Sequence, residues 1–344
     1  MANAVVILGA GASADFGVPT LRGVFKDPYA QLYLSIDNVL RQRLEEIFWQ
    51  PRGYTLQTSE QSLTIEEMLT ILRDWEQEEC LASRPNKDML HDFRKRLYVL
   101  IYNSVYMGKS SRSAHLNPLI AKCRQKLERV TWASFNWDCV FEASYWYASG
   151  SAGLYRHNPT LVIGLDGWRN GNVSQEYLKL HGSINWWMVN GQLTYLSFGA
   201  GGTLVQKWIE YSRGESGQDV PVILEPSAYK YHDATYKFLE PQWQKFFTRL
   251  CEADCVIVVG YSLPDADFQA RSKILTSFQA NNECKWLIID PSRDICGRYR
   301  RLLGQQRVSI LETTLAGFNN NLTANLQSAF GNIDFSDPPA AAAP

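Results

Sequence analysis

The sequence predicts a doubly wound α/β fold with a mainly helical insertion. Short apolar runs rich in β-branched residues recur along the chain, helical stretches separate several of them, and the first run ends in a glycine turn. Short continuous apolar runs are typical of strands that are covered on both faces of a parallel sheet. Strands that alternate with helices indicate an α/β architecture, and 344 residues suffice for one large domain with an insertion.

The first predicted strand covers Ala4–Leu8 and ends at Gly9. Helical stretches are predicted at Ala234–Ala253 and Asp265–Ala280. Further strands are predicted at 129–134, 177–180, 222–224, 255–259, 286–289 and 308–311.

The segment 31–128 differs from the rest, because its apolar residues recur at helical spacing, as in Ile65, Met68, Leu69 and Leu72. Thr64, with Glu66 and Glu67 after it, is typical of a capped helix start. We therefore expect an α/β domain formed by 1–30 and 129–331, with a helical insertion at 31–128.

Two other regions are irregular. The region 150–201 is rich in Gly, Asn, Trp and Tyr, and Asn190-Gly191 favours the turn of a small β-hairpin within it. The Pro/Ala-rich end, 332–344, is expected to be a disordered tail.

Composition excludes several classes of protein. The formal net charge is −1, which gives no general nucleic-acid-binding surface. No run approaches the roughly 18 apolar residues that a membrane span needs, and the N-terminus lacks a basic region, so we expect a cytoplasmic protein. The seven cysteines include no CxxC pair, and Cys251 and Cys255 have no second pair nearby, so we expect free thiols and no metal.

The first chemical motif is Gly9-Ala10-Gly11-Ala12-Ser13, directly after the first strand. Glycines here let the backbone approach a pyrophosphate, although a tight turn without a ligand would also need them. An ordinary dehydrogenase places an acid about 20 residues later, after a second strand. Asp27 lies too close for that role, and the loop 16–23 brings Arg22 near the phosphates instead.

Four segments carry a specific resemblance, and they occur in the same order as in the SIR2 family. GAGASADFGVPTLRG, at 9–23, resembles the family signature, and SFNWD, at 134–138, resembles its Asn-x-Asp element. KLHGS, at 179–183, resembles its Leu-His-Gly element, and GYSL, at 260–263, resembles its later nucleotide-binding turn. The resemblance implies a Rossmann-like domain that binds NAD⁺ as a substrate.

The departures from the family pattern are equally informative. The two CxxC pairs of the SIR2 deacylase zinc module are absent, Phe135 replaces the Gln before Asn136, and Leu21 replaces the Phe before Arg22. In this the chain is similar to the bacterial SIR2-like branch of antiphage defence systems, whose members hydrolyse NAD⁺. The resemblance implies control by homo-oligomerisation or by a partner such as a HerA-type ATPase or a short Argonaute. A deacylase, an ADP-ribosyltransferase and a non-catalytic NAD⁺ or ADP-ribose binder are the alternatives.

The resemblance makes Asn136 and His181 the catalytic pair. Cleavage of the nicotinamide–ribose bond needs a polar group to orient ribose and water, which Asn136 can supply, and a base, which His181 can supply near neutral pH. Asp138 is a candidate for holding the nicotinamide amide, with helix capping as the alternative. Asp265 is either a ligand-binding residue or a helix N-cap, and Asp290 is a candidate for the adenine-ribose hydroxyls. The complete set of predicted nucleotide-binding residues is Gly9, Ala10, Gly11, Ala12, Ser13, Pro19, Thr20, Arg22, Asp138, Gly260, Tyr261, Ser262, Asp265 and Asp290.

Overall fold

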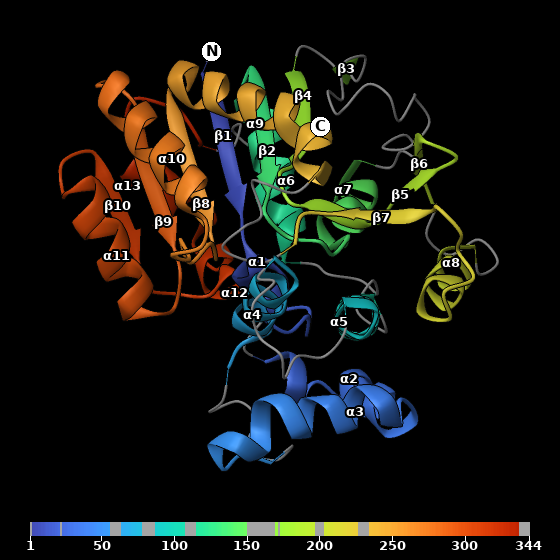
Figure 1. The fold of residues 1–344 in the computed structure, drawn as a ribbon. Coiled ribbons are helices and arrows are strands. Elements are labelled where there is room, and N and C mark those ends of the chain that lie inside the picture. Colours follow the sequence, from blue (N-terminus) through green and yellow to red (C-terminus); the bar gives the residue numbers. More distant parts are fainter. Residues whose placement is uncertain are drawn as a thin grey trace.

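A central sheet of seven strands organises the computed structural model of the chain (Figure 1). The structure describes residues 2–20, 23–55, 63–77, 87–106, 115–149, 169–170, 173–196, 203–225 and 234–336. The spatial order of the strands is β10-β9-β8-β1-β2-β4-β3. The strands are β1 (Asn3–Leu8), β2 (Arg129–Ser134), β3 (Arg169–Asn170), β4 (Val173–Lys179), β8 (Cys255–Val259), β9 (Lys285–Ile289) and β10 (Val308–Leu311).

All neighbouring strands pair in parallel except β3, which is antiparallel to β4. Without β3, the order corresponds to the doubly wound 3-2-1-4-5-6 arrangement, in which the topology reverses direction between β1 and β8. The predicted α/β fold is therefore confirmed, and ligands of such sheets bind beyond the carboxyl ends of the strands at this reversal.

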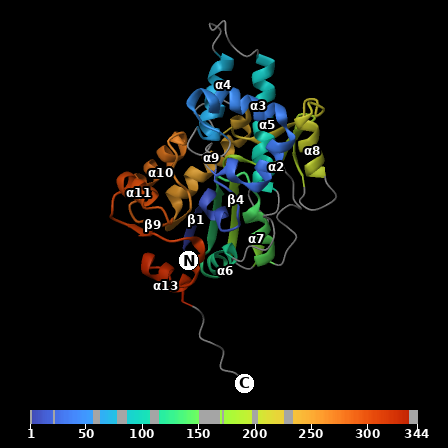
Figure 2. The same ribbon diagram turned by 90° about the horizontal axis from the view of Figure 1, so that it is seen from below.

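Helices cover both faces of the sheet (Figure 2). Alternation along β1 explains why, because Val6 and Leu8 pack into the core on one face, while Val5 and Ile7 pack into the core on the other. The first face is covered by α6 (Leu116–Lys126), α7 (Val140–Ser149), α12 (Leu315–Asn319) and α13 (Leu322–Ala329), and the second by α9 (Ala234–Glu252), α10 (Phe268–Ala280) and α11 (Arg293–Leu303).

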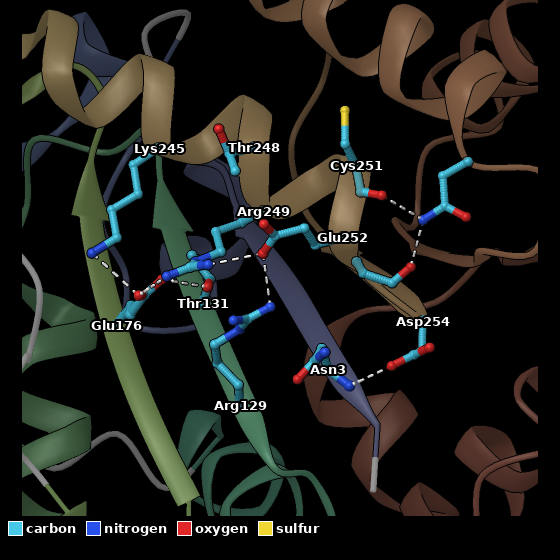
Figure 3. A network of polar contacts seen from close by, with 12 residues as sticks. Asn3, Arg129, Thr131, Glu176, Lys245, Thr248, Arg249, Cys251, Glu252 and Asp254 are labelled. Carbon is cyan, nitrogen blue, oxygen red and sulfur yellow. Dashed lines mark hydrogen bonds and ion pairs between the residues drawn. The ribbon is translucent and has the colours of Figure 1, made fainter.

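An ion-pair network fastens α9 to the sheet (Figure 3). Glu176 of β4 is buried and accepts hydrogen bonds from Arg249 of α9 at 2.5 and 2.7 Å and from Thr131 of β2 at 2.9 Å. Lys245, one turn earlier on α9, lies 3.1 Å from the same carboxylate. One acid thus links two strands to the helix that covers them.

A second, antiparallel sheet corrects part of the strand prediction. The run Val222–Leu224 was expected in the parallel sheet, but β7 (Val220–Ile223) pairs with β5 (Gly182–Val189) in a separate sheet of order β6-β5-β7. The chain reverses at Gly182, whose φ is +74°, and a Cβ atom there would lie 2.1 Å from the Val222 carbonyl oxygen. The main chain after β4 therefore leaves the parallel sheet at this glycine.

The predicted hairpin is confirmed within that second sheet. Asn190 and Gly191 connect β5 to β6 (Gln192–Tyr195) with φ angles of +50° and +74°. Two consecutive positive φ angles are what a two-residue hairpin turn of type I′ requires.

Helices dominate the region between β1 and β2, as the sequence predicts. Thr64 and Glu67 cap α4 reciprocally, since Glu67 N–H donates to Thr64 Oγ1 and Thr64 N–H donates to Glu67 Oε2, at 3.2 and 2.7 Å. The helices are α1 (Ala10–Ala14), α2 (Pro28–Ile36), α3 (Asn38–Arg43), α4 (Ile65–Gln77), α5 (Lys87–Tyr106) and α6, with a π-helix at Leu44–Trp49 and short 3-10 turns at Val24–Lys26 and Gln50–Arg52.

The helices α2 to α5 share a core with the second sheet. Trp187 of β5 and Trp208 of α8 (Thr203–Ser212) pack in one cluster with Phe93 of α5 and Leu69 of α4. The division into domains stays a prediction. Packed chain continues past the boundary expected at residue 331, because Phe335 is fully buried against the first face of the sheet, and residues 337–344 lie outside the described residues.

No helix in the described part of the chain is both long and apolar enough to span a membrane.

Candidate functional site

The predicted site segments follow one row of residues that crosses the parallel sheet. Lys179, Ser134, Leu8, Val259 and Ile289 are register partners on β4, β2, β1, β8 and β9. Each of these residues is the last of its strand. The segments that begin one residue later therefore emerge side by side at the carboxyl edge of the sheet, where α/β folds bind ligands.

Close backbone packing explains the glycines at the centre of this edge. A Cβ atom on Gly9 would lie 2.3 Å from Tyr261 Cα, and one on Gly11 would lie 2.7 Å from Gly260 Cα. Gly11 N–H donates to the Gly260 carbonyl oxygen at 2.9 Å. The turns after β1 and β8 are thus packed backbone against backbone, which any side chain would prevent.

Asn136 ties the turn after β2 to the turn after β1. Its side-chain Nδ2 donates to the Gly9 carbonyl oxygen at 2.8 Å and to Ser13 Oγ at 3.0 Å, while its backbone N–H donates to Ser134 Oγ at 3.1 Å. Because both amide hydrogens are used, Oδ1 remains as the group that can accept a hydrogen bond from a ligand. Asn136 is partly exposed, so a ligand can reach it.

His181 is held in an aromatic environment after β4. Its ring packs edge-on against Phe135, with centroids 5.1 Å apart, and lies 6.2 Å from Trp243 of α9. Its Nε2 lies 3.2 Å from Oδ1 of Asp267, which is 2% exposed. His181 itself keeps 9% of its side chain exposed, so a base here would work in a largely dehydrated site.

In the turn after β8, Tyr261 and Ser262 lie at the carboxyl edge of the sheet, but Asp265 does not start the next helix. Tyr261 is buried, and its hydroxyl donates to Asp267 Oδ2 at 2.8 Å, while the Ser262 carbonyl oxygen accepts from Arg298 at 3.4 Å. The side chain of Asp265 is 87% exposed and pairs with Arg271 at 2.7 Å. The expected helix start at Asp265 is wrong, because residues 264–267 form a turn and the N-cap position of α10 is Asp267.

Asp138 and Asp290 are both buried at the carboxyl edge. Asp138 Oδ1 accepts from Val140 N–H, at the first residue of α7, at 2.9 Å, which is the helix-start role weighed for it. Asp290 accepts from Ser292 N–H at 2.8 Å, and burial raises the pKa of its carboxyl group. Beneath the Asn-x-Asp turn, the fully buried Lys179 contacts the Asp138 carbonyl oxygen.

Of the remaining predicted residues, Ala12 is buried, three others are exposed or half-buried, and one lies outside the described chain. Ala10 and Thr20 are exposed, and Pro19 is half-buried. Arg22 lies outside the described residues. In the described ranges, no three His, Cys, Asp or Glu side chains converge as metal ligands would.

The chain matches one protein-family model. A family model described as a SIR2-like domain matches residues 131–311, which is more than half of the chain. The protein belongs to the SIR2-like family. Among curated protein sequences, none matches the chain.

Several solved structures of Sir2 proteins are similar to this SIR2-like chain. A complex of a Sir2 mutant with a p53 peptide and NAD is 12% identical, with a TM-score of 0.47, and the match covers 93% of this chain and 92% of that one. Sir2Tm bound to a propionylated peptide is 12% identical, with a TM-score of 0.47 and coverage of 95% and 93%. A Sir2 homologue mutant in complex with ADP ribose is 14% identical, with a TM-score of 0.42 and coverage of 96% and 93%.

Sequence reasoning missed Asp267 in this SIR2-like site. The segment Pro264-Asp265-Ala266-Asp267 offers two acids, and only the second is buried against His181. The D-x-D pattern was the available signal, but choosing between its acids requires knowing where α10 begins.

Proposed function

We propose that this SIR2-like protein binds NAD⁺ at the carboxyl edge of its parallel sheet and hydrolyses the nicotinamide–ribose bond. The products are nicotinamide, ADP-ribose or its cyclic form, and a proton, which the attacking water releases in hydrolysis and an attacking hydroxyl releases in cyclisation. The main support for the proposal is that Asn136 and His181 occupy equivalent positions after two neighbouring strands. Each lies two residues beyond a register pair, Ser134 and Lys179, on neighbouring strands.

The chemistry follows from the contacts of these two side chains. As nicotinamide departs as a neutral molecule, positive charge develops on the ribose, and the ring must be held beside a nucleophile. Asn136 Oδ1 accepts a hydrogen bond from the ribose or from water, because its amide hydrogens are engaged by Gly9 and Ser13. His181 then accepts the proton that water or a ribose hydroxyl releases.

The biological role that we propose is depletion of NAD⁺ in a cell infected by phage, as the resemblance to the antiphage branch suggests. An enzyme of this kind must be inactive in a healthy cell. We therefore propose control by self-assembly or by a partner protein of the HerA-type ATPase or short Argonaute kind. The absence of CxxC pairs from the sequence favours hydrolysis over protein deacylation.

Nicotinamide release from NAD⁺ tests the proposal. Purified protein should release nicotinamide, and His181→Ala and Asn136→Ala should each lower the rate by about 10²–10⁴-fold, the usual contribution of a positioned acid–base group. His91→Ala, on the exposed side of α5, is the matched control and should retain the wild-type rate. NAD⁺ binding that persists in His181→Ala separates catalysis from binding.

Two results would contradict the proposal. Undiminished release by His181→Ala and Asn136→Ala would remove both residues from the reaction. A wild-type protein that binds NAD⁺ but releases no nicotinamide, in its isolated, assembled and partner-bound forms, would establish the non-catalytic alternative.

A further inference from the structure

Asp267 is a buried acid whose two oxygens face different partners. Oδ1 lies 3.2 Å from His181 Nε2, and Oδ2 accepts the Tyr261 hydroxyl at 2.8 Å. Asp267 occupies the N-cap position of α10, yet its side chain makes no capping hydrogen bond with the helix. The carboxylate is therefore directed at His181 rather than used to start the helix.

Tyr261 holds this carboxylate in a fixed position. Its ring stacks on Phe135 with centroids 4.0 Å apart and an interplanar angle of 15°, and its carbonyl oxygen accepts the Tyr299 hydroxyl at 2.9 Å. Phe135 in turn contacts the His181 ring edge-on. The tyrosine and histidine rings thus pack against a single phenylalanine, which restricts their rotation, and Asp267 contacts both.

Among the described residues, Asp267 is the charged side chain that contacts His181. Phe135, directly after β2, and Trp243 of α9 pack against the imidazole, and neither ring titrates. The titratable groups on the side of Nε2 are Asp267 and, beyond it, Tyr261. Nε2 is buried and has no hydrogen-bond partner among the described residues, so the Asp267 carboxylate is the group positioned to accept a hydrogen bond from Nε2–H.

We propose that Asp267 is a positioning residue that holds His181 in the Nε2–H form and so directs the Nδ1 lone pair toward the substrate. This proposal rests on the proposed NAD⁺ hydrolysis and assigns the part that Asp267 plays in it. The 3.2 Å contact has the distance but not the angle of a hydrogen bond. Contacts of this kind tighten when substrate is bound.

The advantage of such an acid is electrostatic as well as geometric. Once His181 takes a proton, both ring nitrogens carry hydrogens, and the imidazolium stands in an aromatic site with little water. A carboxylate at one nitrogen stabilises that charge, as it does in acid–histidine pairs of unrelated enzymes. The substrate-side nitrogen remains free to give up the proton at the end of the cycle.

The tautomer of His181 can be measured without any turnover. Nitrogen-15 NMR distinguishes Nδ1–H from Nε2–H in a neutral ring, and the chain has five histidines, so the His181→Ala spectrum identifies the signal. Under conditions where the spectrum shows a neutral ring, the wild type should hold His181 as Nε2–H. Asp267→Asn, which keeps the shape of the side chain, should convert it to a mixture or to Nδ1–H.

Kinetics supply the second measurement. Asp267→Asn should lower kcat by about 10²–10⁴-fold and leave KM for NAD⁺ within about threefold, because the residue acts on the base and not on the ligand. Tyr261→Phe, which keeps the stacking but removes the hydroxyl, should cause a smaller loss. Asp88→Asn is the matched control, since that acid is exposed in the first turn of α5, outside the site, and it should change neither tautomer nor rate.

The outcomes separate this proposal from the proposed function. A wild-type tautomer in folded Asp267→Asn, or an unchanged kcat, would overturn the role of Asp267 even if NAD⁺ is hydrolysed. A protein without hydrolase activity would refute the proposed function, while the tautomer measurement would still decide whether Asp267 orients His181. If Asp267→Asn does not fold, Tyr261→Phe decides by the same two readouts.

Discussion

The buried ion pair between α5 and the end of β7 allows a quantitative stability prediction. Glu225 Oε2 accepts from Arg94 Nη2 at 2.6 Å, from Arg94 Nε at 3.0 Å and from the Tyr98 hydroxyl at 2.6 Å. Arg94 also pairs with Glu76 of α4 at 2.5 Å. The side chains of Glu225 and Arg94 are 1% and 12% exposed, so water cannot replace a lost partner.

Arg94→Met removes the cation and leaves the Glu225 carboxylate buried without a countercharge. Breaking a buried pair from one side costs about 3–5 kcal/mol. For a chain of this length that corresponds to a fall in Tm of about 6–10 °C, from a sensitivity of roughly 2 °C per kcal/mol. The double variant Arg94→Met with Glu225→Met should cost less than the sum of the single changes, because the buried Glu225 carboxylate is gone and only the more exposed Glu76 loses its partner.

Urea unfolding and thermal melts of the single and double variants measure these terms. Arg43→Met is the control, because it breaks a 2.7 Å pair with Asp92 whose carboxylate is 38% exposed, and such pairs contribute about 0–1 kcal/mol. The reasoning is refuted if Arg94→Met costs no more than Arg43→Met, or if the double variant is strictly additive.

Two further predictions concern the sheet. Burial raises the pKa of Glu176, but the hydrogen bond from Arg249 and the other nearby donors outweigh it and lower that pKa from 4.5 to about 2. The pair thus stabilises the fold above about pH 4.5 and loses its effect as pH falls toward about 2. Glu176→Gln should cost about 1–2 kcal/mol at pH 7, allowing for solvent screening, and almost nothing near pH 2, measured by urea unfolding; an equal cost at both pH values would contradict this. Gly260→Ala places a Cβ atom 2.4 Å from Gly11 Cα at a φ of +59°, whereas Gly53→Ala, at a φ of +73° and a ψ of 21°, meets nothing within 4 Å. The first should therefore cost clearly more than the about 1–2 kcal/mol of left-handed strain expected for the second, and equal melting temperatures for the two variants would exclude the steric argument.

Local signals explain what the sequence could predict about the fold. The runs 129–134, 255–259 and 308–311 form strands with those bounds, because short runs that contain β-branched residues favour extended strands in a sheet. The turn at Asn190-Gly191 and the cap at Thr64 were predictable for the same reason, since each depends on neighbouring residues alone.

Contacts between distant segments explain what the sequence could not predict. Val222–Leu224 carries a strand signal, but its pairing with β5 depends on the reversal at Gly182, which lies some 40 residues earlier. The partnership of Asp267 with His181 joins segments that follow different strands of the sheet. A sequence motif identifies the residues at the ends of strands. Which of them contact one another depends on how the strands and helices pack.

The replacement of Gln by Phe135 has a physical reason in this geometry. Phe135 is 6% exposed and contacts Tyr261, His181, Trp243 and Phe246 through its ring. A glutamine amide at this position would be buried among aromatic rings, where an unsatisfied polar group costs about 1–3 kcal/mol. The phenylalanine instead supplies the surface on which the imidazole and the tyrosine rest. Phe135 faces the aromatic cluster, while the adjacent Asn136 keeps its contacts with Gly9 and Ser13. The departure from the SIR2 signature at Phe135 is therefore consistent with a catalytic role for Asn136.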